Sequence, residues 1–361
     1  VSFICRPLTK SMKTLLLFTI STLSILGCKE AEIPKSEYFE SAKVETLVED
    51  NFSVRAITID NEKIWYASDF GKYGYYDFLS KEKKQFSIKK DTIAPEFRSI
   101  SQTGKSIFVL SVGSPALLYK IDKDGSEVKL VYEEKNKKAF YDSMQFWNEK
   151  EGIAIGDPTD DCMSVIITRD SGETWKKISC NELPKTNVGE AAFAASNTSV
   201  QVSGNFAWIF TGGKSARVFF SVDKGNSWEV FKSPIIQGKE MTGIFSGHFY
   251  DENIGFITGG NYEHQEENAG NKALTINGGK TWTLISENAG FGYASCVQFV
   301  PNSGGKQLVT LGYSGLNYSS DNGTTWKQLL KDKDLHTIRF IDNTTAIAAG
   351  KNKIVKVLFM K

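Results

Sequence analysis

Residues that could bind or transfer a charged group recur at one position of a repeated pattern. Short segments that alternate apolar and polar residues can be aligned so that one column contains Arg55, Arg98, Asp142, Glu190, Phe245, Ser295 and His336. Guanidinium groups bind carboxylates or other anions through charge-assisted hydrogen bonds, and carboxylates can act as general acids or bases. The column therefore predicts either a site for a charged group or a partner loop, or a polar ring whose members satisfy one another.

Two loops add polar side chains to the same candidate site. The stretch "GGNYEHQEENAGN" (259–271) carries Tyr262 and His264, and "GDPTDDC" (156–162) carries three aspartates. Three carboxylates could hold Ca²⁺, but they fit an ordinary solvated acidic loop as well. The three histidines, His248, His264 and His336, lack the spacing of a zinc site. We expect no metal and no cofactor.

The elements that position these residues are marked by a recurring turn. It reads "TRDSGETW" at 168, "SVDKGNSW" at 221, "TINGGKTW" at 275 and "SSDNGTTW" at 319. In each copy an Asp or Asn can accept backbone N–H groups, a Gly supplies a positive φ, and a Trp covers the hairpin. The residues expected in these roles are Asp170, Gly172 and Trp175; Asp223, Gly225 and Trp228; Asn277, Gly279 and Trp282; and Asp321, Gly323 and Trp326.

The spacing of the turns predicts a repeat architecture. The copies lie about 50 residues apart, which is the size of a four-stranded propeller blade. Similar pairs of strands without the turn occur before residue 168 and after residue 326. We predict an all-β fold, a seven-bladed β-propeller over residues 42–361, with six or eight blades as alternatives, in which "AKVETLVE" (42–49) supplies the last strand and closes the ring. The register around Glu190 also allows this residue to lie in the loop before its strand.

The first residues predict export. Lys10 and Lys13 precede the apolar run "LLLFTISTLSIL", which ends in Gly27 and Cys28. We expect residues 1–28 to be a lipoprotein signal peptide, with Met12 as an alternative start, and residues 29–41 to be a flexible tether. "ILGC" resembles the lipobox of bacterial lipoproteins, in which the cysteine is acylated. The resemblance implies a protein anchored to the membrane only through lipid, on the periplasmic side of the outer membrane or on the cell surface; an ordinary secretory signal is the alternative.

The remaining cysteines leave two possibilities. Cys162 and Cys180 flank the first turn almost symmetrically, so a hairpin would place them within bridging distance. They form either a disulfide or two buried thiols.

The recurring turn resembles the Asp box, or BNR repeat, of sialidases, sortilin-type receptors and the photosystem II stability and assembly factors. The whole chain resembles the bacterial assembly-factor-like propellers, as in "GEAAFAASNTS" (189–199) and "TGGKSARVFFSVD" (211–223). This resemblance implies a non-catalytic scaffold for protein binding or assembly in the cell envelope. For the alternative, a sialidase-like hydrolase or carbohydrate-binding propeller, the candidate residues are Arg55, Arg98, Arg339, Tyr141, Asp142, Glu190 and Asp69. However, "FRSI" (97–100) lacks the proline of the sialidase signature.

The overall charge of the chain limits the classes of partner that it can attract. With 43 Lys+Arg against 42 Asp+Glu, the chain has no net field that would attract nucleic acid, and any charged partner must be held by a local patch. In a propeller the inner strands surround an axial channel, and the aligned column would ring one mouth of it. We expect a monomer that binds a protein, an anionic group or a carbohydrate at this channel mouth, through Arg55, Arg98, Asp142, Glu190, His336 and Tyr262.

Overall fold

The computed structural model describes residues 38–361, so the predicted signal peptide, Cys28 and most of the predicted tether lie outside the described residues. Within this range the chain forms strands joined by turns and contains no helix. Accordingly, the described part of the chain holds no helix with the length and apolar character needed to cross a membrane.

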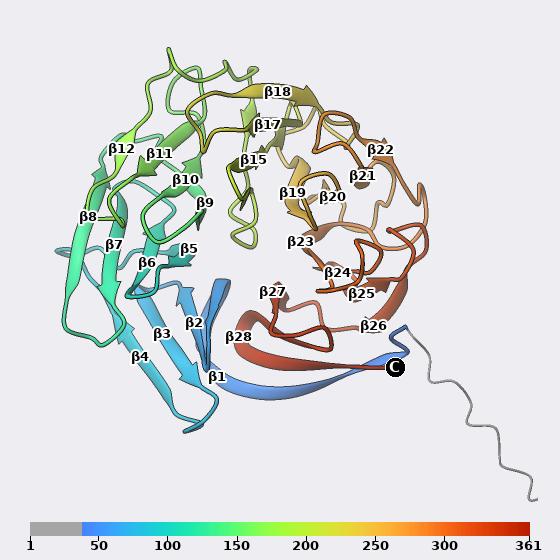
Figure 1. Ribbon diagram of the computed structural model, residues 1–361, viewed down its shortest axis with the longest axis horizontal. Coiled ribbons are helices and arrows are strands. Elements are labelled where there is room, and N and C mark those ends of the chain that lie inside the picture. The colour runs from blue at the N-terminus through green and yellow to red at the C-terminus, as the bar shows by residue number, and fades with distance from the viewer. Residues whose placement is uncertain (1–37) are drawn as a thin grey trace, which may run out of the picture. The chain divides into compact units, whose positions relative to one another are not determined.

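The strands form six hydrogen-bonded sheets arranged around a ring, which is a β-propeller (Figure 1). The largest sheets have six strands each. One has the order β27(Leu335–Phe340), β28(Thr345–Met360), β1(Ser41–Asp60), β2(Lys63–Ser68), β3(Lys72–Asp77), β4(Lys83–Ser87). The other has the order β13(Glu190–Ala191), β16(Gly212–Gly213), β19(Thr242–Phe249), β20(Gly255–Asn261), β21(Lys272–Thr275), β22(Thr283–Leu284).

The remaining sheets have four strands each. The first comprises β5(Phe97–Gln102), β6(Ser106–Ser111), β7(Ala116–Asp122) and β8(Val128–Glu134). The second comprises β9(Tyr141–Phe146), β10(Gly152–Gly156), β11(Ser164–Thr168) and β12(Lys176–Lys177). The third comprises β14(Val200–Ser203), β15(Phe206–Phe210), β17(Arg217–Ser221) and β18(Glu229–Lys232). The last comprises β23(Ala294–Phe299), β24(Leu308–Gly312), β25(Gly315–Ser319) and β26(Lys327–Leu330).

The predicted count of seven separate blades is wrong, because hydrogen bonding gives six sheets. The difference arises in the long strands β1 and β28. The first half of β1 pairs with β28 and its second half pairs with β2, so the strands predicted for the first and last blades form one continuous sheet. Inner strands β1, β5, β9, β14, β19, β23 and β27 contact one another in that order around the ring.

The predicted closure of the ring is confirmed. Val44 lies opposite Val357 and Ala42 opposite Phe359, so the first described strand pairs with the last along an antiparallel ladder. Figure 1 shows the two strands side by side, blue and red. This pairing covers the edge that β28 would otherwise expose, because β28 then has β27 and β1 as neighbours.

The core lies between adjacent sheets. The second strands, such as β6 and β10, are buried along their whole length because each is covered by a neighbouring sheet on both faces. This explains why they read as continuous apolar runs rather than as alternating patterns. A typical contact layer packs Ile153 and Ile155 of one sheet against Ile209 and Phe219 of the next.

The four recurring turns share one hydrogen-bond pattern. In the first, Asp170 Oδ1 accepts hydrogen bonds from Thr168 Oγ1 (2.8 Å) and from the Thr174 amide (3.0 Å), and Gly172 N–H donates to Thr168 Oγ1. The same bonds recur around Asp223, Asn277 and Asp321. Gly172 has φ +77° and a Cβ there would lie 2.1 Å from the Phe108 ring of the preceding sheet. Backbone conformation and packing therefore both require glycine.

Candidate functional site at the mouth of the channel

A segment of the chain fills the middle of the ring. We call residues 193–199 the channel plug; they follow β13 and lead into β14, and the loop is yellow-green in Figure 1. Its residues, "FAASNTS", are mostly small and polar, and all except Phe193 are buried. Short side chains suit this position because they hydrogen-bond to strand backbones without needing the space of a large side chain.

One half of the ring is tied to the plug through Asn197. Its Nδ2 donates to the carbonyl oxygen of Ile100 in β5 (2.8 Å), and its Oδ1 accepts from the amide of Met144 in β9 (2.9 Å). Asn197 has φ +59°, a conformation that asparagine tolerates better than most residues. One side chain therefore joins two sheets that are distant from it in sequence.

The other half of the ring is bound by the plug's hydroxyl and carbonyl groups. Ser196 Oγ donates to the carbonyl of Ser295 (2.6 Å), and Thr198 Oγ1 shares a hydrogen bond with Ser246 Oγ (2.8 Å). Thr337 Oγ1 donates to the carbonyl of Ser196 (3.2 Å). The predicted axial channel is thus filled at this level, and the mouth is a blind cavity with the plug as its floor.

The cavity above the plug has a volume of about 360 Å³ and contains the two predicted arginines. We call it the arginine cavity; its lining residues are Arg55, Arg98, Phe140, Asp157, residues 191–195, Glu240, Met241, Phe245, Tyr262 and Tyr293. Arg55 donates to the carbonyl of Ala195 (3.3 Å) and forms no ion pair with any described residue within 4.0 Å, whereas Arg98 pairs with Glu96 (2.6 Å). Burial and, next, the positive charge of Arg98 lower the pKa of Arg55.

One wall of the arginine cavity is aromatic. Phe193 of the plug stacks on Phe245 with ring centroids 3.7 Å apart, and Tyr293 meets Phe245 edge-on at 4.8 Å. Tyr262 packs edge-on against Tyr293 at 5.1 Å and remains 41% exposed. The cavity therefore presents uncompensated positive charge beside an apolar face, a combination that suits an anionic group attached to an apolar one.

A second cavity of about 580 Å³ adjoins the first. We call it the acidic cavity; it is lined by Lys138, residues 157, 158, 160 and 161, residues 186–191, and Glu240. Asp157, Ala191 and Glu240 line both cavities, so the two are contiguous. Val188 on its rim is 91% exposed.

Asp142 is a buried carboxylate without a hydrogen-bond partner. It is 0% exposed, and neither of its oxygens has a partner among the described residues. Burial and the nearby charge of Asp157 raise its pKa well above the usual value, although Arg98 acts in the opposite direction. Burial also raises the pKa of Asp157 to about 6, while its bond from the Ala192 amide lowers it. The two aspartates are therefore neutral at pH values where exposed aspartates are charged.

Glu190 does not belong to the predicted column. It lies in β13, which pairs with β16 rather than within the β14 sheet. Arg217 Nε donates to Glu190 Oε1 (3.0 Å), Thr211 Oγ1 donates to the same oxygen (2.6 Å), and the Asn187 amide donates to Oε2 (2.8 Å). Its carboxylate is thus saturated by local partners, and it acts as a structural ion pair at the edge of the acidic cavity.

His336 lies near the two arginines but does not line either cavity. Burial, followed by the charges of Arg55 and Arg98, lowers the pKa of its imidazole to about 3. The side chain is therefore neutral over the physiological range and adds no positive charge to the mouth.

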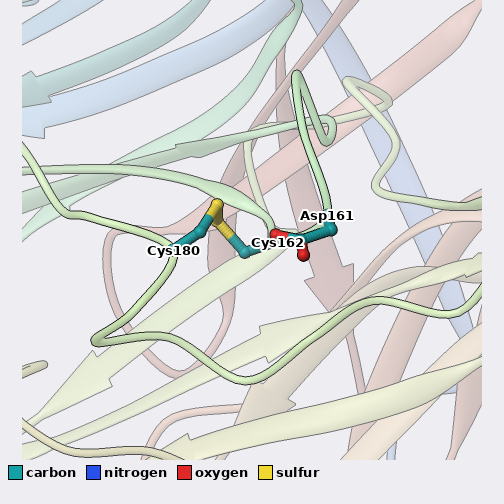
Figure 2. A group of neighbouring side chains, drawn as sticks. All are labelled: Asp161, Cys162 and Cys180. Carbon is teal, nitrogen blue, oxygen red and sulfur yellow. A yellow bond between two sulfur atoms is a disulfide. The ribbon is translucent and has the colours of Figure 1, made fainter.

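The acidic loop lines the acidic cavity, and a disulfide holds it in place. Cys162 and Cys180 are joined by a disulfide (Figure 2). The backbone of Cys162 also forms an isolated antiparallel β-bridge with Lys185. Asp161 lies beside the disulfide and pairs with Lys185. Sulfur atoms bonded to each other cannot act as thiolate ligands. Among residues 38–361, the carboxylates of Asp157, Asp160 and Asp161 do not converge on one point as Ca²⁺ ligands would.

The candidate residues for sialidase-type chemistry are not brought together. Arg339 does not line the cavity, because its guanidinium binds the plug carbonyls of Ser196 (3.1 Å) and Asn197 (3.5 Å). Tyr141 is fully buried and donates to Glu134 (2.8 Å). Asp69 accepts from the Ser53 amide (2.9 Å). An arginine triad with a tyrosine nucleophile is therefore not assembled at the mouth.

Sequence reasoning found Phe245 and Tyr262 of the aromatic wall but missed the plug, Phe193 and Tyr293 of that wall, and the Asp142–Asp157 pair. The pair carries a weak signal, since Asp142 is the second residue of β9 and Asp157 directly follows β10 in the same hairpin, where Gly156 lies opposite Tyr141. The plug carries a signal in composition only, a run of small polar residues where an inner strand was expected.

Comparison with known proteins finds the fold and no family. No family model matches the chain, and no curated protein matches its sequence. The structure titled "YCF48 bound to D1 peptide" is similar with a TM-score of 0.64 at 13% identity, covering 91% of this chain and 98% of its own. "YCF48 from Cyanidioschyzon merolae" gives 0.64 at 12%, with 88% and 99% coverage.

The WD40 repeats of RRP9 also resemble the chain, with a TM-score of 0.64 at 11% identity and coverage of 89% and 100%. At these identities the similarities show the β-propeller fold alone.

Proposed function

We propose that the protein is a non-catalytic β-propeller scaffold that binds a segment of a partner protein at the channel mouth. The observation that carries this proposal is Arg55, a largely buried cation that has no carboxylate partner among the described residues and faces a cavity with an aromatic wall. A buried charge without a partner is costly, so an anionic group of a ligand would relieve an existing penalty. One similar propeller was solved with a peptide bound, which supports a protein ligand.

The mechanism would be rigid presentation. The plug fixes the cavity floor by hydrogen bonds to strands all around the ring, so little conformational entropy is lost when a ligand binds. Arg55 and Arg98 would supply charge-assisted hydrogen bonds, and the aromatic wall would bury an adjoining apolar group.

A capture experiment tests this proposal. The full chain, the Arg55→Gln/Arg98→Gln variant and a control variant, Lys232→Gln/Lys280→Gln, serve as baits for membrane extracts of the source organism. Both control lysines are exposed, so the control removes the same charge away from the mouth. We expect a partner that is recovered by the wild type and the control and lost with the arginine variant. Identical recovery by all three baits would contradict the proposal.

We also propose that Cys28 carries the lipid that holds the scaffold in the cell envelope. The basis is the apolar run that ends in "ILGC". Metabolic labelling with an alkyne fatty acid should mark the wild-type chain and not Cys28→Ser. Equal labelling of both chains, or no labelling of the wild type, would overturn the anchor.

A further inference from the structure

The two cavities form one groove whose ends have opposite charge. They share a wall made by Asp157, Ala191 and Glu240, so a ligand can pass from one to the other without leaving the surface. On one side lie Arg55 and Arg98. On the other side lies Asp160, and Glu240 lies in the shared wall; both are exposed and without an ion pair among residues 38–361.

Lys138 also lines the negative end, but it forms no ion pair with the carboxylates there. Asp161 is paired with Lys185 and Glu190 with Arg217, but Asp157 accepts only a backbone amide among the hydrogen bonds in the described chain. Beside Asp157 is Asp142, fully buried and without any partner for either oxygen. A cation placed against this wall would interact favourably with the exposed carboxylates of Asp160 and Glu240, which have no cation partner among the described residues.

Apolar side chains border both halves of the groove. Tyr262 lines the arginine cavity and Val188 lines the acidic cavity, and both are exposed to solvent. Solitary exposed apolar residues are common, but here each borders a cavity and could contact the backbone and side chains of a bound chain.

We propose that the groove binds an extended protein segment that carries charges of both signs, with an acidic group against Arg55 and Arg98 and a lysine or arginine side chain against Asp160 and Glu240. This inference rests on the proposed function and adds the chemistry of the partner. A single segment can occupy both cavities because they are contiguous, and charge complementarity would set its direction along the groove.

A peptide selection tests this inference. Random peptides of about twelve residues, a length that spans such a groove when extended, are displayed on phage and selected on the immobilised full chain. The same library is selected on Arg55→Gln/Arg98→Gln, on Asp160→Lys/Glu240→Lys, and on the control Glu82→Lys/Glu229→Lys. The control makes the same change of charge at exposed glutamates outside both cavities.

We expect wild type and control to select peptides that combine an acidic residue with a basic one at a fixed separation. Asp160→Lys/Glu240→Lys should replace the basic preference by an acidic one and weaken a wild-type peptide about 10- to 100-fold, with binding recovered when the basic residue of the peptide is changed to glutamate.

Two results overturn parts of the proposal separately. If the peptides require the arginines but show no basic preference, and Asp160→Lys/Glu240→Lys binds the same peptides, the dipolar segment is wrong and the mouth remains a protein site. If no selected peptide depends on Arg55 and Arg98, the proposed function fails, and this inference fails with it.

Discussion

At the scale of single residues, the main feature is that polar groups at similar positions serve different purposes. Arg55 is partly buried and Asp142 fully buried, and neither has a charged or hydrogen-bonding side-chain partner among the described residues, whereas Glu190 is surrounded by donors. The first two leave favourable interactions unmade and so point to a ligand or a proton. Glu190 stabilises the fold.

The buried pair Asp142 and Asp157 should make stability depend on pH. A carboxyl whose pKa is raised in the folded state stays protonated while the unfolded chain ionises, so it lowers stability as pH rises from about 4 through the folded pKa. Asp142→Asn removes this effect. We expect the free energy of unfolding of the variant, relative to wild type, to increase by about 1–3 kcal/mol between pH 4.5 and pH 7.5. Urea unfolding at the two pH values measures this, and a difference that does not change with pH would refute the assignment.

The ion pair of Glu190 and Arg217 should be important for stability. The Glu190 side chain is 0% exposed, so Arg217→Ala leaves a buried carboxylate without its cation. We expect a loss of about 3–5 kcal/mol in the free energy of unfolding. Lys129→Ala is the control because its pair with Glu173 is exposed on both sides, and it should cost less than about 1 kcal/mol. Similar losses for both variants in denaturant unfolding would show that the buried ion pair contributes no more to stability than the exposed one.

At the scale of elements, the plug connects parts of the chain that are distant in sequence. Asn197→Ala removes its hydrogen bonds to β5 and β9 and places alanine at a positive φ. We expect this change to lower the free energy of unfolding by roughly 3 kcal/mol. Asn352 has φ +64° but is exposed, so Asn352→Ala should cost only about 1 kcal/mol. Comparing the thermal unfolding of the two variants separates the contribution of the hydrogen bonds to stability from that of backbone strain. Equal shifts in Tm would contradict the role of the plug.

Contacts between residues close in sequence were predictable from the sequence, and contacts between distant elements were not. The turn residues Asp170, Asp223, Asn277 and Asp321 were predictable because each interacts with residues at most four positions away. The pairing of Glu190 with Arg217 was not predictable, since it depends on β13 pairing with β16 rather than with β14. The plug was also missed, because its partners lie up to 143 residues away and leave no periodic pattern.

At the scale of the whole molecule, stability depends on joining the two ends of the described chain. Residues 41–49 pair with β28, and the preceding Phe39 packs against Phe359 and Tyr318. The predicted closure was right because both segments show strand patterns, but their fusion into one sheet depends on long strands that the local pattern does not reveal.

Removing this closing segment should open the ring. A chain that begins at Asn51 lacks buried Phe39 and Val48, which alone contribute roughly 4 kcal/mol, and it exposes an edge of β28. We expect a lower Tm and self-association by size-exclusion chromatography, compared with a chain that begins at Ser36. If the shorter chain stays monomeric with an unchanged Tm, the closure does not stabilise the ring.

Crosslinking at the channel mouth is the most direct test of whether a partner protein binds there. A photo-reactive benzoylphenylalanine replaces Tyr262 at the mouth or, as a control, Ile276, which is exposed in one of the recurring turns. We expect a discrete crosslinked protein in the source cells from position 262 and not from position 276, and its disappearance when Arg55→Gln/Arg98→Gln is added. Crosslinking from position 276 alone, or crosslinking at 262 that persists without the arginines, would contradict it.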